Sequence, residues 1–330
     1  MPARTGTKKS AERKRPATTR GATASTKWNL RRGGGLQILE APALARLNWL
    51  VHGFSTRPGG TSDLKVSSDG RNTSEAVLNL GFTDWDTSER VRDNREKFFR
   101  SIGASEMRVV ALRQIHSDIV HVVSPSSENT AASVASESAP QGDALITRER
   151  GVLLVVQIAD CIPILLADPK RHAIAAIHSG WRGTVRRIAA KALGRMQMEF
   201  GTRTEDVVAA LGPGIGQSCY EVGTEVAAEF HAQFPNARHW FAGPFDQLAD
   251  SDNDPNWLPW LTMKPPGHAP PSPRVHLDLI AANRAILEEA GIRPRNIASS
   301  GFCTACRSDL FFSFRKERAT GRMMAAIGIR

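Results

Sequence analysis

Long apolar runs and abundant cysteines are both missing from this chain of 330 residues. The longest apolar stretch, residues 151–159, is about half of what a bilayer span requires, and the N-terminus lacks the apolar segment of a secretory signal peptide. Four cysteines are too few for a disulfide scaffold. Two of them form Cys303-x-x-Cys306, which alone lacks the four ligands of structural zinc, so we expect free thiols. The expected setting is a reducing cytoplasm, with no membrane partner.

Acidic residues are almost absent from the first 33 residues, which hold ten Lys or Arg and the single acid Glu12. This segment carries +9 of the formal net charge of +10, so the rest of the chain is nearly neutral. The basic character therefore describes a tail and not a binding face. Residues 1–35 lack apolar periodicity, and we predict a disordered basic tail. A solvated tail, a nucleic-acid-binding arm and an organellar transit peptide all remain open as interpretations.

The chain after this tail reads as one folded unit, residues 36–330, with two polar interruptions. Residues 124–141 are rich in Ser and Ala, and residues 243–273 are rich in Pro, Asp and Trp. Neither segment has a periodicity that could build a core. Both are therefore predicted to be surface loop insertions.

Short apolar runs bounded by turn residues predict buried strands, and apolar residues at helical spacing predict helices that end at glycine. The strands follow one another instead of alternating strictly with helices. This order favours an α+β fold with a mixed sheet or sandwich covered by helices. The expected strands are Val152–Gln157, Ile162–Ala167, Ala173–Ile177 and Val207–Leu211, and the expected helices are Thr184–Phe200 and Leu277–Ala290.

Several common catalytic motifs are absent. The sequence has no P-loop, no His-Glu-x-x-His pair and no Gly-x-Ser-x-Gly elbow. Residues 212–216, Gly-Pro-Gly-Ile-Gly, follow a predicted strand, but their glycine spacing does not match a dinucleotide-binding turn. We interpret this segment as a tight turn beside a site.

Three segments place metal-competent side chains at the ends of predicted strands. His116 lies within Arg-Gln-Ile-His-Ser, Cys161 follows Asp160 after an apolar run, and His178 begins His-Ser-Gly-Trp-Arg-Gly. A single Cys at a strand end is usually a small hydrophobe, and separations of 45 and 17 residues form no local ligand signature. Two imidazoles and one thiolate are nevertheless a set that zinc accepts. Three protein ligands would leave a fourth position for water or substrate.

The segment after His178 also suits an anion. Gly180 and Gly183 let the backbone approach a ligand, and the following helix points its N-terminal N–H groups at the turn. Arg182 is a candidate bidentate anion clamp, and a purely structural pairing of this arginine is the alternative.

A series of motifs runs in order from about residue 50 to the C-terminus and closely resembles the YfiH family, the laccase-domain or polyphenol-oxidase-like proteins later described as purine nucleoside phosphorylases. The resemblance covers most of the chain and leaves out the basic tail. The motifs are His52-Gly-Phe-Ser-Thr-Arg57, Leu78-Asn-Leu-Gly81, Gln114-x-His116, Gly142-Asp143-Ala144, Ala159-Asp-Cys161-Ile-Pro163, His178-Ser-Gly-Trp-Arg-Gly183, Cys219-Tyr-Glu-Val222, Cys303-Thr and Phe311-Phe-Ser-x-Arg315 with Gly321-Arg322.

The resemblance implies a single compact α+β domain, a mixed β-sandwich flanked by helices, similar in layout to the catalytic domain of cytotoxic necrotising factors. It implies that His116, Cys161 and His178 bind one zinc ion, with copper less favoured. It also implies phosphorolysis of adenosine, inosine, guanosine and methylthioadenosine, together with deamination of adenosine. Two residues depart from the usual motifs: Ile158 stands where many members have Thr or Ser, and Ser179 replaces a common Ala.

Purine nucleosides and phosphate are therefore the expected partners. Phosphorolysis requires phosphate beside the anomeric carbon of the ribose, a task that suits the metal with Arg57 or Arg182. Asn79 and Gln114, from the same motifs, complete the predicted substrate-binding set. Deamination requires a carboxyl group that shuttles a proton, and Asp160 is the candidate. A structural carboxylate that bonds the turn is an equal alternative for this residue.

Three other functions stay open. The same zinc site would serve a hydrolase that removes misincorporated serine from the peptidoglycan precursor UDP-MurNAc-Ser. Copper-dependent polyphenol oxidation is disfavoured, because a multicopper oxidase needs many more His ligands than a trio and the chain has nine His in all. The third is non-enzymatic, with the basic tail recruiting nucleic acid to an inert domain. The sequence indicates no oligomeric state.

Overall fold

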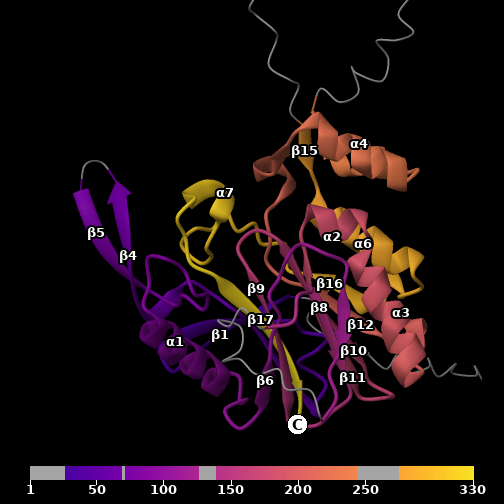
Figure 1. The fold of residues 1–330 in the computed structure, drawn as a ribbon, viewed down its shortest axis with the longest axis horizontal. Coiled ribbons are helices and arrows are strands. Elements are labelled where there is room, and N and C mark those ends of the chain that lie inside the picture. The colour runs from indigo at the N-terminus through magenta and orange to yellow at the C-terminus, as the bar shows by residue number, and fades with distance from the viewer. Residues whose placement is uncertain (1–26, 69–70, 126–138, 244–274) are drawn as a thin grey trace, which may run out of the picture.

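The computed structural model describes residues 27–68, 71–125, 139–243 and 275–330. These residues form four layers: helix α1 (Ser88–Ser101), a six-stranded sheet, a second six-stranded sheet, and a group of helices over the outer face of the second sheet (Figure 1). The expected α+β fold, a mixed β-sandwich flanked by helices, is confirmed. Among the described residues, no helix combines the length and the apolar character that a bilayer crossing demands.

The first sheet is antiparallel except where β6 pairs with β9. The long β4–β5 hairpin extends from its side (Figure 1). The strands of the first sheet, in spatial order, are β1 (Asn29–Gly33), β2 (Leu36–Glu40), β3 (Leu50–Ser55), β17 (Met323–Ile329), β9 (Val152–Ile158) and β6 (Arg108–Val110), and the hairpin consists of β4 (Pro58–Ser68) and β5 (Arg71–Val77).

Strand β1 corrects the end of the predicted basic tail. Residues 29–33 pair with β2, and the Arg31 guanidinium donates to the Glu40 carboxylate at 2.7 Å and to the Ser101 carbonyl at 2.7 Å. Their polar sequence resembles a tail because β1 is an edge strand, and edge strands commonly carry exposed charged side chains. The predicted disorder of residues 1–26 lies outside the described residues.

The second sheet is antiparallel in its centre and parallel at both edges, where β12 pairs with β16 and β7 pairs with β8. A small third sheet lies beyond it. The strands of the second sheet are β16 (Ile297–Ser299), β12 (Val208–Leu211), β10 (Ile162–Asp168), β11 (Ala173–Ser179), β8 (Ala144–Thr147) and β7 (Val120–Val122), and those of the third are β13 (Glu221–Val222), β15 (Val275–Leu277) and β14 (Phe241–Ala242).

Burial on both faces explains why the central strands are continuously apolar. On β10, Ile164 faces the covering helices whereas Leu165 faces the first sheet. On β9, Leu154 faces the second sheet whereas Leu153 faces α1. A strand covered on both sides cannot alternate apolar with polar residues. The four predicted strands are accordingly all present, with ends that differ by one or two residues.

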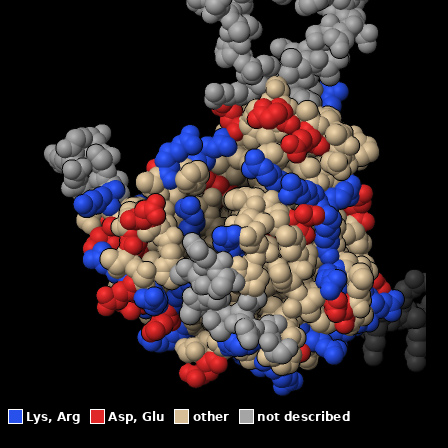
Figure 2. Space-filling view, in the orientation of Figure 1, with Lys and Arg blue, Asp and Glu red and all other residues tan. Residues whose placement is uncertain are grey.

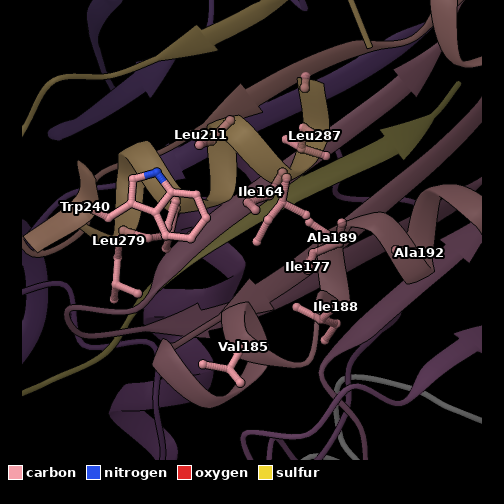
Figure 3. Close-up of a cluster of buried hydrophobic side chains, with 14 of the residues drawn as sticks. Ile164, Ile177, Val185, Ile188, Ala189, Ala192, Leu211, Trp240, Leu279 and Leu287 are labelled. Carbon is pink, nitrogen blue, oxygen red and sulfur yellow. The ribbon is translucent and has the colours of Figure 1, made fainter. Parts of the chain in front are cut away.

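The helical layer packs on the outer face of the second sheet. Ile188 and Ala192 of one helix and Leu279 and Leu287 of another meet Ile164 in this part of the core (Figure 3). The remaining helices are α2 (Trp181–Val185), α3 (Ile188–Phe200), α4 (Thr224–Gln233), α6 (Leu279–Glu289) and α7 (Phe314–Glu317), and the short 3-10 turns are η2 (Thr204–Asp206), η3 (Gln217–Cys219), η4 (Ala237–Trp240) and η7 (Pro294–Asn296).

The two predicted helices start differently from the prediction. The helix expected over Thr184–Phe200 is split into α2 and α3, because Arg187 adopts a φ of 58° that an α-helix cannot contain. Arg187 is held there by an ion pair with Glu289 and by the ring of Phe234. The helix expected from Leu277 begins at Leu279, because Asp278 caps it through the backbone N–H of Ala281.

The two predicted loop insertions fall mainly outside the described residues. Of residues 124–141, the structure describes only 124–125 and 139–141, and of residues 243–273 it describes only Gly243.

The burial of His52 generates a prediction on acid stability. His52 lies on β3, its Nε2 accepts the backbone N–H of Ala41 at 2.9 Å, and burial lowers its pKa from 6.5 to about 4. The unfolded chain therefore binds a proton at His52 more readily than the folded chain. The free energy of unfolding should fall as pH drops from about 6.5 towards 4, by ~3 kcal/mol from this residue.

Urea unfolding at a series of pH values measures this contribution. The His52→Gln variant keeps a hydrogen-bond acceptor and removes the titration, so its unfolding free energy should depend less steeply on pH over that range. Equal slopes in both proteins would contradict the assignment.

Candidate metal centre

Three distant segments bring two imidazoles and a thiol together at one end of the sandwich. His116 lies in the loop after β6, Cys161 lies in the turn between β9 and β10, and His178 lies near the end of β11. One donor atom from each lies within 4.8 Å of the others, and this set could hold a metal ion. Cys161 Sγ and His116 Nε2 are 3.9 Å apart. We call these three residues the primary metal centre.

Asp143 positions both imidazoles. Its buried carboxylate receives the backbone N–H groups of Ile115, His116 and Ser117, at 3.3, 3.1 and 2.6 Å, and the Ser117 hydroxyl at 2.7 Å. The same carboxylate pairs with Nδ1 of His178 at 2.8 Å. Nε2 of His178 is therefore left to face the thiol, as in metal sites where a carboxylate fixes the orientation of a ligating His.

The electrostatics favour a thiolate at Cys161 and a protonated ring at His178. Burial raises the pKa of the Cys161 thiol, but the adjacent His178 and His116 outweigh burial and bring it to about 6. Burial lowers the pKa of His178, but Cys161 and Asp143 outweigh it and raise it to about 9. Desolvation also opposes ionisation of Asp143, yet hydrogen bonds from His178 and Ser117 bring its pKa to about 2. Thiolate is the form that binds metals.

Gly180 is required by the close packing of the ligands. A Cβ at this position would lie 2.8 Å from Cys161 Sγ and 3.2 Å from Cδ2 of His116, so no larger residue fits without moving a ligand. The preceding Ser179, where the family motif usually has Ala, is fully buried and donates to Asn283 Oδ1 at 2.8 Å. Its extra hydroxyl is thereby satisfied.

Two non-glycine residues at the centre have positive φ angles. His116 has φ of 58° and Asp160 has φ of 90°, both outside the regions that L-residues prefer. The backbone N–H of His116 is held by Asp143, and the Asp160 carbonyl accepts from the Ile215 N–H at 2.8 Å. Such strain persists only where surrounding bonds fix it, and it is concentrated at functional sites.

A cavity of about 560 Å³ opens over the primary metal centre. Lys and Arg side chains flank the hollow on this face, between the positions of α7 and α2 (Figures 1 and 2). The lining residues are Leu112, Arg113, Gln114, His116, Gln157, Ile158, Ala159, Asp160, Cys161, His178, Trp181, Arg182, Tyr220, Phe314, Arg315 and Arg322.

Three of the lining arginines lie over aromatic rings that also line the cavity. Arginine over a ring is held by cation–π attraction, which orients the guanidinium without neutralising it. The pairs are Arg182 over Trp181 at 4.4 Å, Arg315 over Tyr220 at 5.0 Å and Arg322 over Phe314 at 5.6 Å, each measured from Cζ to the ring centroid.

Of the predicted substrate-binding residues, Gln114 and Arg182 line the cavity and two others do not. Arg57 is buried outside the lining, where its guanidinium pairs with Glu75 at 2.7 Å and also with Glu317. Asn79 is fully buried, and its amide oxygen accepts the Arg322 backbone N–H at 2.9 Å. Asn79 therefore contacts the segment that carries a lining arginine and not the cavity itself.

Asp160 lines the cavity with both carboxylate oxygens engaged. Oδ1 accepts from the Thr304 hydroxyl at 2.6 Å, and Oδ2 accepts from the Arg315 backbone N–H at 2.6 Å. These contacts match the alternative in which Asp160 is a structural carboxylate that bonds the turn.

Sequence reasoning assigned no role to Asp143, Arg315 or Arg322, although all three lie in motifs of the family resemblance. Their positions in those motifs were the available signal. No spacing rule connects Arg315 and Arg322 to residues near 116 and 161, because only the tertiary fold brings the C-terminal segment to the cavity.

The role of Asp143 generates a prediction on metal affinity. Asp143→Asn keeps the shape of the side chain but removes the charge that orients His178, so metal affinity should fall by about 10- to 100-fold. Competition with a chelator of known affinity measures this change. Asp118→Asn is the matched control, because Asp118 lies in the loop that carries His116 and pairs with Lys191 on the surface. Equal affinity in the wild-type and Asp143→Asn proteins would contradict the role.

Comparisons with known proteins identify relatives of this chain. A curated purine nucleoside phosphorylase of Deinococcus radiodurans is 35% identical over 297 residues, which cover 89% of this chain and 94% of that protein. Adenosine deaminase RL5, from an unknown prokaryotic organism, is 35% identical over 267 residues, which cover 81% of this chain and 88% of that protein.

Two solved structures share the fold. YfiH of Bacillus licheniformis matches with a TM-score of 0.73 and 27% identity, covering 92% of this chain and 99% of that one. YlmD of Geobacillus stearothermophilus matches with a TM-score of 0.72 and 29% identity, covering 91% and 98%. The family model described as multi-copper polyphenol oxidoreductase laccase matches residues 51–330. The chain therefore belongs to this laccase-domain family, together with the YfiH and YlmD proteins.

Proposed function

We propose that this chain is a zinc-dependent purine nucleoside phosphorylase that acts on adenosine, inosine, guanosine and methylthioadenosine and also deaminates adenosine. The observation that carries the proposal is that the primary metal centre and three arginines, Arg182, Arg315 and Arg322, line the same cavity. The names of the relatives from Deinococcus radiodurans and of RL5 support the two activities.

The donor set fits zinc. Zinc accepts imidazole and thiolate in tetrahedral sites, and three protein ligands leave one position for a reacting group. When bound, zinc would supply Lewis-acid chemistry at an oxygen of phosphate or water. Copper accepts the same donors, so metal analysis forms part of the test below.

The arginines supply the anion site. Arg182, Arg315 and Arg322 line the cavity, and within the described residues no carboxylate forms an ion pair with any of them. Phosphate oxygens accept charge-assisted hydrogen bonds from guanidinium groups, often in pairs. These residues would hold phosphate beside the ribose. Arg57, which carries two carboxylate partners, leaves that role to them.

The aromatic residues of the wall suit a purine base. Trp181, Tyr220 and Phe314 present apolar surface to the cavity, and Gln114 is fixed by exchanging hydrogen bonds with the backbone of Gln157 at 2.7 and 2.8 Å. Burial raises the pKa of Tyr220, so its hydroxyl stays protonated and can donate a hydrogen bond. A base with ring nitrogens offers acceptors for that donor.

The role of Asp160 differs between the two activities. In phosphorolysis its two hydrogen bonds would hold Thr304 and the Arg315 backbone in place. In deamination Asp160 would in addition carry a proton, and each carboxylate oxygen keeps a second lone pair for it beside the bond that it already accepts. The two hydrogen bonds are therefore compatible with either activity.

The first test is a product assay on purified protein of known zinc and copper content. Adenosine with phosphate should yield adenine and ribose-1-phosphate, and adenosine without phosphate should yield inosine. Cys161→Ala or His116→Ala should reduce both activities to background while the circular dichroism spectrum stays unchanged. Absence of turnover from protein that holds zinc would reject the nucleoside assignment, whereas turnover by a folded, metal-free variant would reject the dependence on zinc.

The second test concerns phosphate binding by Arg182. Arg182→Met keeps much of the packing on Trp181 and removes the charge, so KM for phosphate should rise by about 10- to 100-fold. Arg186→Met is the matched control, because Arg186 is exposed and lies outside the cavity lining. An unchanged KM for phosphate in Arg182→Met would remove this residue from the anion site.

A further inference from the structure

A second group of side chains that could bind a metal, made of three thiols, lies outside the cavity lining. Cys219, Cys303 and Cys306 are free thiols whose sulfur atoms all lie within 4.8 Å of one another. The sulfurs of Cys219 and Cys306 are 3.3 Å apart. The first of these residues ends η3, and the other two lie in the segment between β16 and α7. We call them the cysteine cluster.

Backbone contacts hold the two segments of the cluster together. The backbone N–H of Thr304 donates to the Gly214 carbonyl at 3.0 Å, and Gly214 and Cys303 form a parallel bridge. A Cβ at Gly216 would lie only 3.1 Å from the Cys303 Cβ, so glycine permits this close approach. The sulfurs are therefore positioned by the main chain and not by flexible side chains alone.

Backbone amides also solvate the Cys303 sulfur. The Gly216 N–H donates to it at 3.1 Å, and the N–H groups of Ala305 and Cys306 add further hydrogen bonds. Amides from the second and third residues after a cysteine stabilise negative charge on its sulfur. Such donors favour the thiolate form of Cys303, which is the form that binds metals.

We propose that Cys219, Cys303 and Cys306 bind a second metal ion, a thiophilic cation with Zn²⁺ as the probe, and that its fourth position opens to solvent beside exposed Cys306. Thiolates select soft or borderline ions such as Zn²⁺ over Mg²⁺ or Ca²⁺. Tetrahedral zinc with bonds of about 2.3 Å separates two sulfurs by roughly 3.8 Å. This value lies above the 3.3 Å between Cys219 and Cys306 and below the 4.8 Å within which all three sulfurs lie. Each thiol releases its proton to solvent on binding.

The second metal ion would hold together two segments beside the cavity over the primary metal centre. Cys219 precedes Tyr220, whose ring lines the cavity, and Cys303 precedes Thr304, whose hydroxyl binds Asp160 at 2.6 Å. Joining the two cysteines through one ion would fix both neighbours relative to the primary metal centre. This second ion would act through the positions of Tyr220 and Thr304 and not through contact with the substrate.

Metal analysis of reduced, zinc-loaded protein tests the proposal. The wild-type protein should hold two zinc ions per chain, Cys306→Ser and Cys161→Ala should each hold one, and the double variant should hold none. Ser218→Ala is the matched control, because it changes the same turn and leaves all three thiols in place. A single zinc in the wild-type protein that is lost in Cys161→Ala and unchanged in Cys306→Ser would overturn the proposal.

Thiol alkylation keeps the test decisive if a variant fails to fold. In zinc-loaded wild-type protein, Cys219, Cys303 and Cys306 should resist alkylation and should react after a chelator is added, as peptide mass spectrometry would record. Alkylation of all three at equal rates with and without zinc would contradict a metal site. A disulfide between Cys219 and Cys306 under reducing conditions, seen as a loss of two hydrogens, would overturn it as well.

Discussion

The hydrogen bonds of one buried carboxylate, Asp143, hold the primary metal centre together. Its partners are the loop around His116 and the ring of His178, which come from different parts of the chain. A buried charge is costly unless hydrogen bonds compensate it, and here the compensating groups belong to the ligand-bearing segments. The carboxylate therefore gains its partners only when both histidines are in place. The stability of this end of the sandwich and the geometry of the site therefore depend on the same hydrogen bonds.

The turn at Asp160 and Cys161 carries the chain from the first sheet to the second. β9 ends at Ile158 and β10 begins at Ile162, so few residues are available for the crossing, and Asp160 takes a φ of 90°. Contacts from Thr304 and the Arg315 backbone fix this strained turn. The thiol ligand is thus placed by the geometry of the crossing, and the C-terminal segment that stabilises the crossing also brings Arg315 to the cavity.

Sequence predicted most reliably what depends on local pattern. The runs that became β9, β10 and β11 are apolar throughout because both faces are buried, and that signal needs no tertiary information. The convergence of the metal ligands followed only from family resemblance, since their spacing carries no signal. The β1 strand and the break at Arg187 were missed because both depend on contacts outside the local sequence pattern: β1 pairs with β2, and Arg187 contacts Glu289 and Phe234.

The contrast between Arg57 and the arginines of the cavity shows why motif membership does not fix a role. Arg57 lies over a ring as well, that of Phe312, but Glu75 and Glu317 neutralise its charge. The guanidinium groups of Arg315 and Arg322 donate instead to backbone carbonyls. A carbonyl and a ring orient a guanidinium while leaving its full charge to the cavity, whereas a carboxylate would cancel it. An arginine that binds an anion needs partners such as carbonyls and rings, which leave its charge uncancelled. An arginine with a structural role, such as Arg57, can pair with carboxylates.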